Sequence, residues 1–168
     1  MTEEHAIEKS ALFTLRVVDA DDVAFLQEVY ASTRLDELTQ LPWNEEQRSA
    51  FIRMQFTAQR QHYLKHYPNA RQELILVGQQ PIGRLYVNRG NGIHILDFTI
   101  LPEHRGHGIG SSIMKFLLEE AEEARKSVTI YVESFNPSRR LFERLGFAEI
   151  ESDGINLLLE RPARKENQ

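Results

Sequence analysis

Two kinds of hydrophobic pattern follow one another along the chain. Short apolar runs bounded by turn-forming residues predict β-strands over residues 11–18, 74–77, 82–87, 93–100, 128–132, 147–150 and 155–159. Apolar residues that recur three or four positions apart predict helices over about residues 19–32, 44–67, 110–123 and 137–145. Residues 33–43 fit neither pattern and are expected to form an irregular link.

The order of these elements predicts one α/β domain. The turn sequences GQQP and NRGNG join the three strands in the middle of the chain, which indicates an antiparallel meander. The strand at 128–132 follows a helix, and a helical crossover usually joins parallel neighbours. We therefore expect a single domain over residues 1–168, with its core at about 12–160 and frayed ends at 1–10 and 162–168.

Composition narrows the class of protein. The 168 residues contain no cysteine, which excludes disulfides, thiolate metal sites and a cysteine nucleophile, and suits a reducing cytosol. The N-terminal MTEEHAIEKS lacks the apolar core of a signal peptide, and no run approaches the ~20 apolar residues that span a bilayer. The net charge of −5 argues against nucleic-acid binding. We expect a cytoplasmic protein with neither a membrane nor a nucleic acid as partner.

A glycine-rich stretch stands where the third helix should begin, in the sequence RGHGIG from Arg105 to Gly110. Glycine inside a helix costs about 1 kcal/mol relative to alanine, so three glycines need an explanation. The start of a helix carries unpaired N–H groups and a partial positive charge, and glycines let a ligand approach the backbone. The stretch therefore suits an anion such as phosphate, with Arg105 adding charge and Ser111 a hydroxyl.

Other phosphate-binding motifs do not fit this stretch. A Walker loop needs a lysine before Ser or Thr, and here Gly110 precedes Ser111 directly. The dinucleotide fingerprint has the spacing GxGxxG, whereas this loop has GxGxG. A flexible glycine loop without a ligand remains the alternative reading of the loop taken alone.

Over about residues 12–160 the chain resembles the GNAT superfamily of acyl-CoA-dependent N-acyltransferases. The family signature Arg/Gln-x-x-Gly-x-Gly/Ala matches the stretch from Arg105 to Gly110, after the typical LPEH of residues 101–104. A second family motif resembles NPSRRLFERLGF, from Asn136 to Phe147, and the order of elements is similar too. The resemblance implies a mixed, mostly antiparallel sheet of about seven strands with a splayed parallel pair, flanked by about four helices.

The resemblance also implies acetyl-CoA as co-substrate, with no metal. Main-chain N–H groups of the loop would bind the coenzyme A pyrophosphate, a role that falls on Arg105, Gly106, His107, Gly108, Ile109, Gly110 and Ser111. The splayed strand would pair with the pantetheine arm through Phe98, Thr99 and Ile100, where one N–H would polarise the thioester carbonyl. Asn136 would contact the cofactor from the far side.

The implied chemistry is direct transfer of an acetyl group to an amine, without a covalent intermediate. The acceptor would be a small-molecule or peptide amine, which must first lose a proton to a base. His94, four residues before Phe98, is the first candidate base, against a structural role for a strand histidine. Glu133 is the second, against a surface role, and Asp97 should face the opposite side of a regular strand from His94 and Phe98.

One residue departs from the family pattern. Many members carry a tyrosine that protonates the leaving thiolate, and the matching position here is Phe142. Either the thiolate leaves unassisted or another donor serves, with Tyr131 and Tyr86 as candidates. A non-catalytic module that binds acyl-CoA or a protein is therefore the alternative function, and a homodimer is a further expectation from the family.

Acceptor specificity in the family comes from the first two helices and their link. Tyr30, Arg34 and Trp43 are the residues expected to bind the acceptor; Trp43 is either a pocket wall or a plug on the core. Asp36 and Glu37 are either ammonium partners or solvated acids. His62 and His66 have the spacing of a metal pair, but a solvated helix face explains them without a third ligand.

Overall fold

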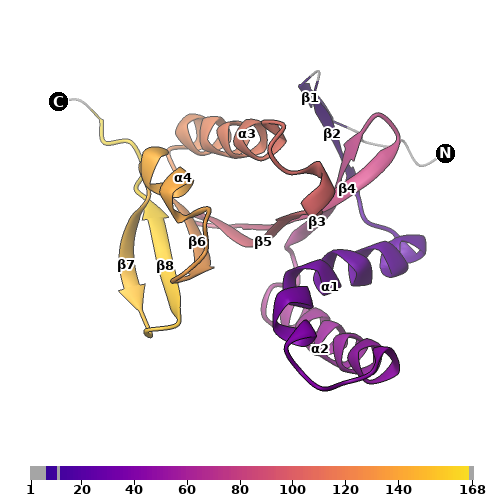
Figure 1. Ribbon diagram of the computed structural model, residues 1–168. Coiled ribbons are helices and arrows are strands. Elements are labelled where there is room, and N and C mark those ends of the chain that lie inside the picture. Colours follow the sequence, from indigo (N-terminus) through magenta and orange to yellow (C-terminus); the bar gives the residue numbers. More distant parts are fainter. Residues whose placement is uncertain (1–6, 11, 167–168) are drawn as a thin grey trace.

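A computed structural model describes residues 7–10 and 12–166, which form one eight-stranded sheet with helices on both faces (Figure 1). The strands are β1 (Ile7–Ser10), β2 (Phe13–Val17), β3 (Arg71–Val77), β4 (Gln80–Arg89), β5 (Ile93–Ile100), β6 (Val128–Glu133), β7 (Ala148–Ser152) and β8 (Asn156–Arg161). The α-helices are α1 (Val23–Thr39), α2 (Glu45–His66), α3 (Ile109–Ala124) and α4 (Arg139–Arg144). Two 3-10 turns, Ala20–Asp22 and Pro102–His104, precede α1 and α3.

The strand order is β1-β2-β3-β4-β5-β6-β8-β7. Only β5 and β6 pair in parallel among the described strands, and every other neighbouring pair is antiparallel. The predicted mixed sheet with one parallel pair and four helices is therefore confirmed. The additional strand is β1, which pairs with β2 although residues 7–10 fell in the expected frayed end.

Two hydrophobic clusters fix the helices to opposite faces of the sheet (Figure 1). The larger cluster packs α3 onto the sheet through side chains that include Ile113, Met114 and Leu117, all 0% exposed. The smaller cluster packs α1 and α2 onto the other face. It consists of Leu26, Tyr30, Phe56 and Leu74, with Val18, Val23, Phe25, Ile52 and Leu76 packed around it.

Local signals explain where the first two helices begin and end. The predicted capping box at the start of α2 is confirmed: Gln47 N donates to Asn44 Oδ1 at 2.8 Å, and Asn44 N donates to Gln47 Oε1 at 2.9 Å. The expected end of α1 at Ser32 was wrong. The hydroxyls of Ser32 and Thr33 each donate to a carbonyl of the preceding turn, so these polar residues do not end the helix, which continues to Thr39.

Candidate active site

The parallel strands β5 and β6 diverge part of the way along their length. They pair over three residues, and Ile95–Ile130 is the last pair, although β5 continues to Ile100 and β6 to Glu133. The other edge of β5 stays paired with β4 as far as Gly83. Main-chain groups of β5 beyond Ile95 therefore face β6 without pairing to it, as the predicted splay requires.

A β-bulge lies where β5 begins to leave β6. The register of β4 and β5 passes from the pair Val87–Ile95 directly to the pair Tyr86–Asp97. Leu96 is thus an extra residue on β5. Each side chain after it lies on the face opposite to the one that regular alternation would give it.

This bulge corrects the expected directions of Asp97 and Phe98 relative to His94. In a regular strand Asp97 would face away from His94, but the bulge places Asp97 and His94 on the same face, beneath α1 and α2. Phe98 moves to the other face, where it packs against the cluster under α3. The sequence pattern predicted the strand correctly, and the interval of three positions between the polar residues His94 and Asp97 was a sign of the extra residue that the assumption of regular alternation missed.

The face that carries His94 and Asp97 continues onto β6. Val128, Ile130 and Val132 are buried in the cluster under α3, so the alternating residues of β6 point to the opposite side. We call this surface the His94 face, defined by His94, Asp97, Thr129, Tyr131 and Glu133. Its residues lie on β5 and β6, the two strands that diverge.

His94 is held in a defined orientation by its neighbours. Its Nδ1 lies 2.8 Å from the Oγ1 of Thr129 on β6, and its ring centroid is 5.8 Å from that of Tyr131 and 5.9 Å from that of Tyr67. Burial lowers the pKa of His94 below 6.5, and the hydrogen bond with Thr129 only partly offsets this. The imidazole is therefore neutral at pH 7, and Nε2 is the nitrogen left to accept a proton when Nδ1–H donates to Thr129.

The structure brings Glu133 together with Arg34, one of the expected acceptor-binding residues. Nη1 of Arg34 on α1 lies 3.8 Å from Oε1 of Glu133 at the end of β6. The same nitrogen lies 3.5 Å from Oε1 of Glu37, and the guanidinium carbon lies 5.6 Å from the centroid of the Tyr30 ring. Helix α1 thus contacts β6 beyond the point where β5 and β6 separate.

The other two expected acceptor-binding residues have different settings. Tyr30 is buried in the cluster with Phe56, and its hydroxyl accepts a long hydrogen bond of 3.4 Å from Nε of Arg34. Trp43 packs edge-on against Phe51 of α2, with ring centroids 5.2 Å apart. Only Tyr30 and Arg34 are therefore joined to the His94 face by these contacts.

The glycine-rich loop forms the start of α3. Gly106 and Gly108 have φ angles of 80° and 81°, in the left-handed region that favours glycine. A Cβ at either position would meet nothing within 4 Å, so the loop is open to solvent there. The first helical hydrogen bond runs from Ser112 N to Gly108 O at 3.1 Å, so the N–H groups just before Ser112 precede the helical ladder.

Arg105 ties this loop to the diverging strand. Its Nε donates to the carbonyl of Ile100, the last residue of β5, at 2.8 Å. The glycine-rich loop therefore lies next to the point where β5 ends, beside the gap between β5 and β6. Open left-handed glycines, helix-start N–H groups and an unpaired strand edge fit an elongated ligand with a phosphate at one end and amides at the other.

The second family motif also lies near the end of β6. Asn136 follows β6, and its Oδ1 accepts a hydrogen bond from Ser138 N at 2.8 Å, which shapes the turn into α4. Phe142 is 4% exposed and packs against Phe147, with ring centroids 5.5 Å apart. Tyr131, one of the candidate donors, is 57% exposed, and its ring lies beside that of His94.

A buried polar group under the bulge was not found from the sequence. Arg84 on β4 forms an ion pair with Asp97, and its Nη2 also donates to Oε1 of Gln59 at 3.0 Å. Thr99 donates its hydroxyl to Oδ1 of Asp97 at 2.7 Å, and the Tyr63 hydroxyl donates to the carbonyl of Leu96 at 3.0 Å. Burial lowers the pKa of Arg84 to about 10, so it stays charged.

A sequence signal for this group did exist. Arg84 and Asp97 are single charged residues within the apolar runs IGRLYV and IHILDFTI, on strands predicted to be neighbours. Charged side chains are almost never fully buried unless they are paired. Those two charges were therefore candidates for one ion pair across the meander.

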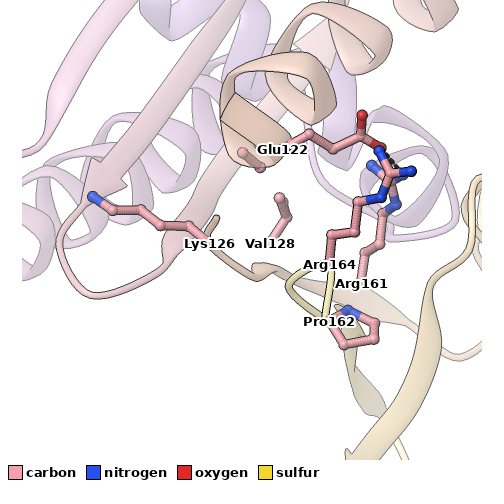
Figure 2. A pocket seen from close by; sticks show the side chains of 7 residues that line it. Glu122, Lys126, Val128, Arg161, Pro162 and Arg164 are labelled. Atoms are coloured by element: carbon pink, nitrogen blue, oxygen red, sulfur yellow. Dashed lines mark hydrogen bonds and ion pairs between the residues drawn. The ribbon is translucent and has the colours of Figure 1, made fainter. Parts of the chain in front are cut away.

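A separate hollow of about 220 Å3 lies at the far end of α3 (Figure 2). Figure 2 shows Arg161 and Arg164 beside Glu122, with the ammonium of Lys126 pointing away from them. Nη2 of Arg161 donates to Oε1 of Glu122 at 2.6 Å, so this charge is already neutralised. None of the expected site residues lines the hollow.

No helix within residues 7–10 and 12–166 is long and apolar enough to cross a membrane. In the same part of the chain, no three His, Cys, Asp or Glu side chains are grouped to hold a metal ion. The rings of His62 and His66 on α2 lie with their centroids 4.4 Å apart and their planes tilted by 47°.

Comparisons with known proteins agree with this geometry. Residues 28–147 match a family described as the Acetyltransferase (GNAT) family, whereas no curated protein matches the chain in sequence. The fold is similar to that of PaiA N-acetyltransferase from Thermoplasma acidophilum in complex with coenzyme A, with 16% identity, a TM-score of 0.68, and 89% of this chain and 98% of that one covered.

Two further solved structures are similar. An acetyltransferase from Thermus thermophilus has 20% identity and a TM-score of 0.65, with 90% of this chain and 97% of that one covered. A protein described as histone acetyltransferase HPA2 and related acetyltransferase, from Corynebacterium glutamicum, has 16% identity and a TM-score of 0.68, with 94% and 99% covered. At these identities the likeness concerns the fold.

Proposed function

Because the chain belongs to the GNAT acetyltransferase family, we propose that it transfers the acetyl group of acetyl-CoA directly to an amine acceptor. The observation that carries this proposal is the divergence of β5 from β6 directly beside the glycine-rich start of α3. The divergence offers unpaired main-chain groups to an amide-containing arm, and the helix start offers N–H groups to a phosphate.

Each part of the cofactor has matching groups on this chain. Main-chain N–H groups between Arg105 and Ser111 would hold the pyrophosphate, and those of Phe98, Thr99 and Ile100 would pair with the pantetheine arm. Asn136, in the turn after β6, would contact the arm from the other strand. Acetyl-CoA supplies the acetyl thioester that the acceptor amine attacks, and leaves as the CoA thiol.

His94 is the proposed base. Most alkylamines have a pKa near 10, so at neutral pH the acceptor must lose a proton before it can attack. His94 is neutral at pH 7 because burial lowers its pKa, and Thr129 engages Nδ1, which leaves Nε2 to accept that proton. The support for this role is therefore geometric as well as electrostatic, because His94 lies in the last part of β5 that still pairs with β6.

Tyr131 is the proposed proton donor to the leaving CoA thiolate, in place of the tyrosine that many family members have at the Phe142 position. Its hydroxyl-bearing ring is exposed beside His94, whereas the Phe142 ring is buried against Phe147. The absence of a hydroxyl on Phe142 also keeps a second function open: a non-catalytic module that binds acyl-CoA. Replacement Tyr131→Phe should slow transfer without changing acetyl-CoA binding if Tyr131 is the donor.

Release of free CoA thiol separates these two functions. Purified protein, acetyl-CoA and a panel of amines are mixed, and thiol release is followed against a sample without protein. Release that depends on both amine and protein supports acetyl transfer. A thermal shift with acetyl-CoA, but no amine-dependent thiol release with any acceptor, supports the binding module. A shift with ATP and none with acetyl-CoA contradicts both.

A further inference from the structure

Arg34 contacts the end of β6 from the side of the sheet that α1 covers. It projects from α1, and its Nη1 lies 3.8 Å from Oε1 of Glu133, the last residue of β6. Glu133 belongs to the His94 face, two residues beyond Tyr131, whose ring contacts His94. The Arg34–Glu133 ion pair therefore lies on the His94 face, four residues further along β6 than Thr129, the residue of β6 that pairs with His94.

The guanidinium of Arg34 is charged but incompletely bonded. Its contacts with Glu37, Glu133 and the Tyr30 hydroxyl measure 3.5, 3.8 and 3.4 Å, whereas good charge-assisted hydrogen bonds measure about 2.7–2.9 Å. Nη2 of Arg34 bonds no acceptor within residues 7–10 and 12–166. The side chains of Arg34 and Glu133 are 34% and 41% exposed, so both can be reached.

We infer that the Arg34–Glu133 pair selects free α-amino acids, in which a carboxylate stands next to the reactive amine. This inference rests on the proposed acetyl transfer and narrows its acceptor. The acceptor carboxylate takes a bidentate position on the Arg34 guanidinium, and its ammonium takes the place of Arg34 beside Glu133. Each charge of the original pair keeps an opposite charge beside it.

This exchange of partners favours a zwitterionic amino acid over two other classes of acceptor, namely amines without a carboxylate and peptide N-termini. An amine without a carboxylate would draw Glu133 away from Arg34 and leave that half-buried guanidinium with only the exposed Glu37. A peptide N-terminus carries its carboxylate far from the amine, so its binding would also leave the Arg34 guanidinium without a replacement for Glu133. Because the two side chains are 34% and 41% exposed, the cost of this loss is modest, but it falls only on acceptors that lack a carboxylate next to the amine.

An amino acid acceptor would react by the same acetyl transfer as any other amine. The amino group forms a C–N bond to the acetyl carbon, and the thioester C–S bond breaks. Of the two protons that the ammonium loses, one ends on the CoA thiol and the other reaches solvent through His94.

The test uses acceptors in matched sets of three. Alanine, leucine, phenylalanine and glutamate are each compared with the corresponding α-amide and the decarboxylated amine, and kcat/KM is taken from thiol release with acetyl-CoA. The wild type should prefer at least one free amino acid over its amide and its decarboxylated amine by about tenfold or more. Arg34→Gln should remove that preference, and Arg34→Lys should keep part of it.

Two controls separate specificity from folding. Arg53→Gln makes the same charge change at an exposed position on α2 and should leave the preference intact. The thermal shift with acetyl-CoA should persist in Arg34→Gln. Faster transfer to the amides or amines than to the acids, or an unchanged preference in Arg34→Gln, overturns the inference and leaves acetyl transfer standing. No thiol release with any acceptor overturns both.

Discussion

Asp97 lies on the same face of the sheet as His94, although it stands three positions further along β5. The extra residue Leu96 causes this, because a bulge shifts the alternation of side chains by one position. The bulge falls where β5 leaves β6, so the local geometry that opens the sheet also gathers ionisable side chains at the opening. The ion pair between Asp97 and Arg84 holds β5 to β4 at that point.

We predict that Asp97→Asn lowers the free energy of unfolding by about 2–4 kcal/mol, because it leaves the charge of Arg84 buried without its partner. Urea unfolding followed by circular dichroism measures this. The double variant Arg84→Met with Asp97→Asn should recover at least half of the loss, since it removes the stranded charge. A single variant as stable as the wild type would mean that the ion pair does not hold the bulge.

Gly83 tests how closely β4 supports the diverging end of β5. A Cβ at this position would lie 2.2 Å from the carbonyl oxygen of Thr99, and a backbone atom cannot move aside cheaply. Gly83→Ala should therefore destabilise the protein by about 1–3 kcal/mol and weaken acetyl-CoA binding, because it displaces the pantetheine-binding strand. Gly90→Ala is the matched control, since a Cβ there meets nothing within 4 Å. Equal stability of the two variants would contradict this packing.

The pH dependence of turnover tests His94 as the base. Its pKa lies below 6.5, so kcat/KM should fall as pH decreases through a midpoint below 6.5, where the imidazole becomes protonated. His94→Gln should lower kcat/KM by about a hundredfold at pH 7 and abolish this acidic limb. The acetyl-CoA thermal shift should stay unchanged. An acidic limb that persists in His94→Gln assigns the base to another group.

The same shift predicts a change in stability with pH. His94 binds a proton more weakly in the folded chain than in the unfolded chain, so its contribution to stability is complete above pH 6.5. That contribution should be lost as pH falls from 6.5 towards the folded-state pKa. Unfolding free energies of wild type and His94→Gln, compared across pH 5–8, measure it as a difference that appears only on the acidic side. A constant difference would contradict the lowered pKa.

The glycine loop can be tested with a control that carries equal backbone strain. Gly108→Ala and Gly154→Ala both place a side chain at a left-handed φ, 81° and 90°, in open space, at a cost of about 1–2 kcal/mol each. Only Gly108 lies at the start of α3. We predict similar losses of stability, but a weakened affinity for acetyl-CoA only in Gly108→Ala, measured by calorimetry. Equal losses of affinity would assign the effect to strain alone.

Most of the fold was predictable because its signals are local. Periodicity located the elements, the capping residue Asn44 placed the start of α2, and the meander and the crossover predicted the single parallel pair. Boundaries that depend on tertiary contacts were missed, as in α1, where buried Leu38 belongs to a helical turn beyond the expected end. The strand β1 was missed for a related reason, since only pairing with β2 reveals it.

The candidate site was predictable in its motifs but not in its geometry. The sequence from Arg105 to Gly110 predicts the start of a helix that suits an anion, and this prediction does not depend on the rest of the fold. The bulge at Leu96 does have a sequence signal, because an extra residue shifts the alternation of a strand. Polar residues stand at position 94 and then at 97 and 99, with apolar residues at 93, 95, 98 and 100, so the polar phase changes across Leu96. The contact of Arg34 with Glu133 joins residues from distant parts of the chain, and no local pattern encodes it.

A crystal structure with bound acetyl-CoA tests the central claim most directly. It should show the pyrophosphate oxygens accepting hydrogen bonds from main-chain N–H groups between Gly106 and Ser111, and the pantetheine arm lying between β5 and β6. Cofactor bound elsewhere, for example with its phosphates on Arg164 and Lys126 at the far end of α3, would contradict it. So would β5 and β6 paired along their full length with the loop left empty.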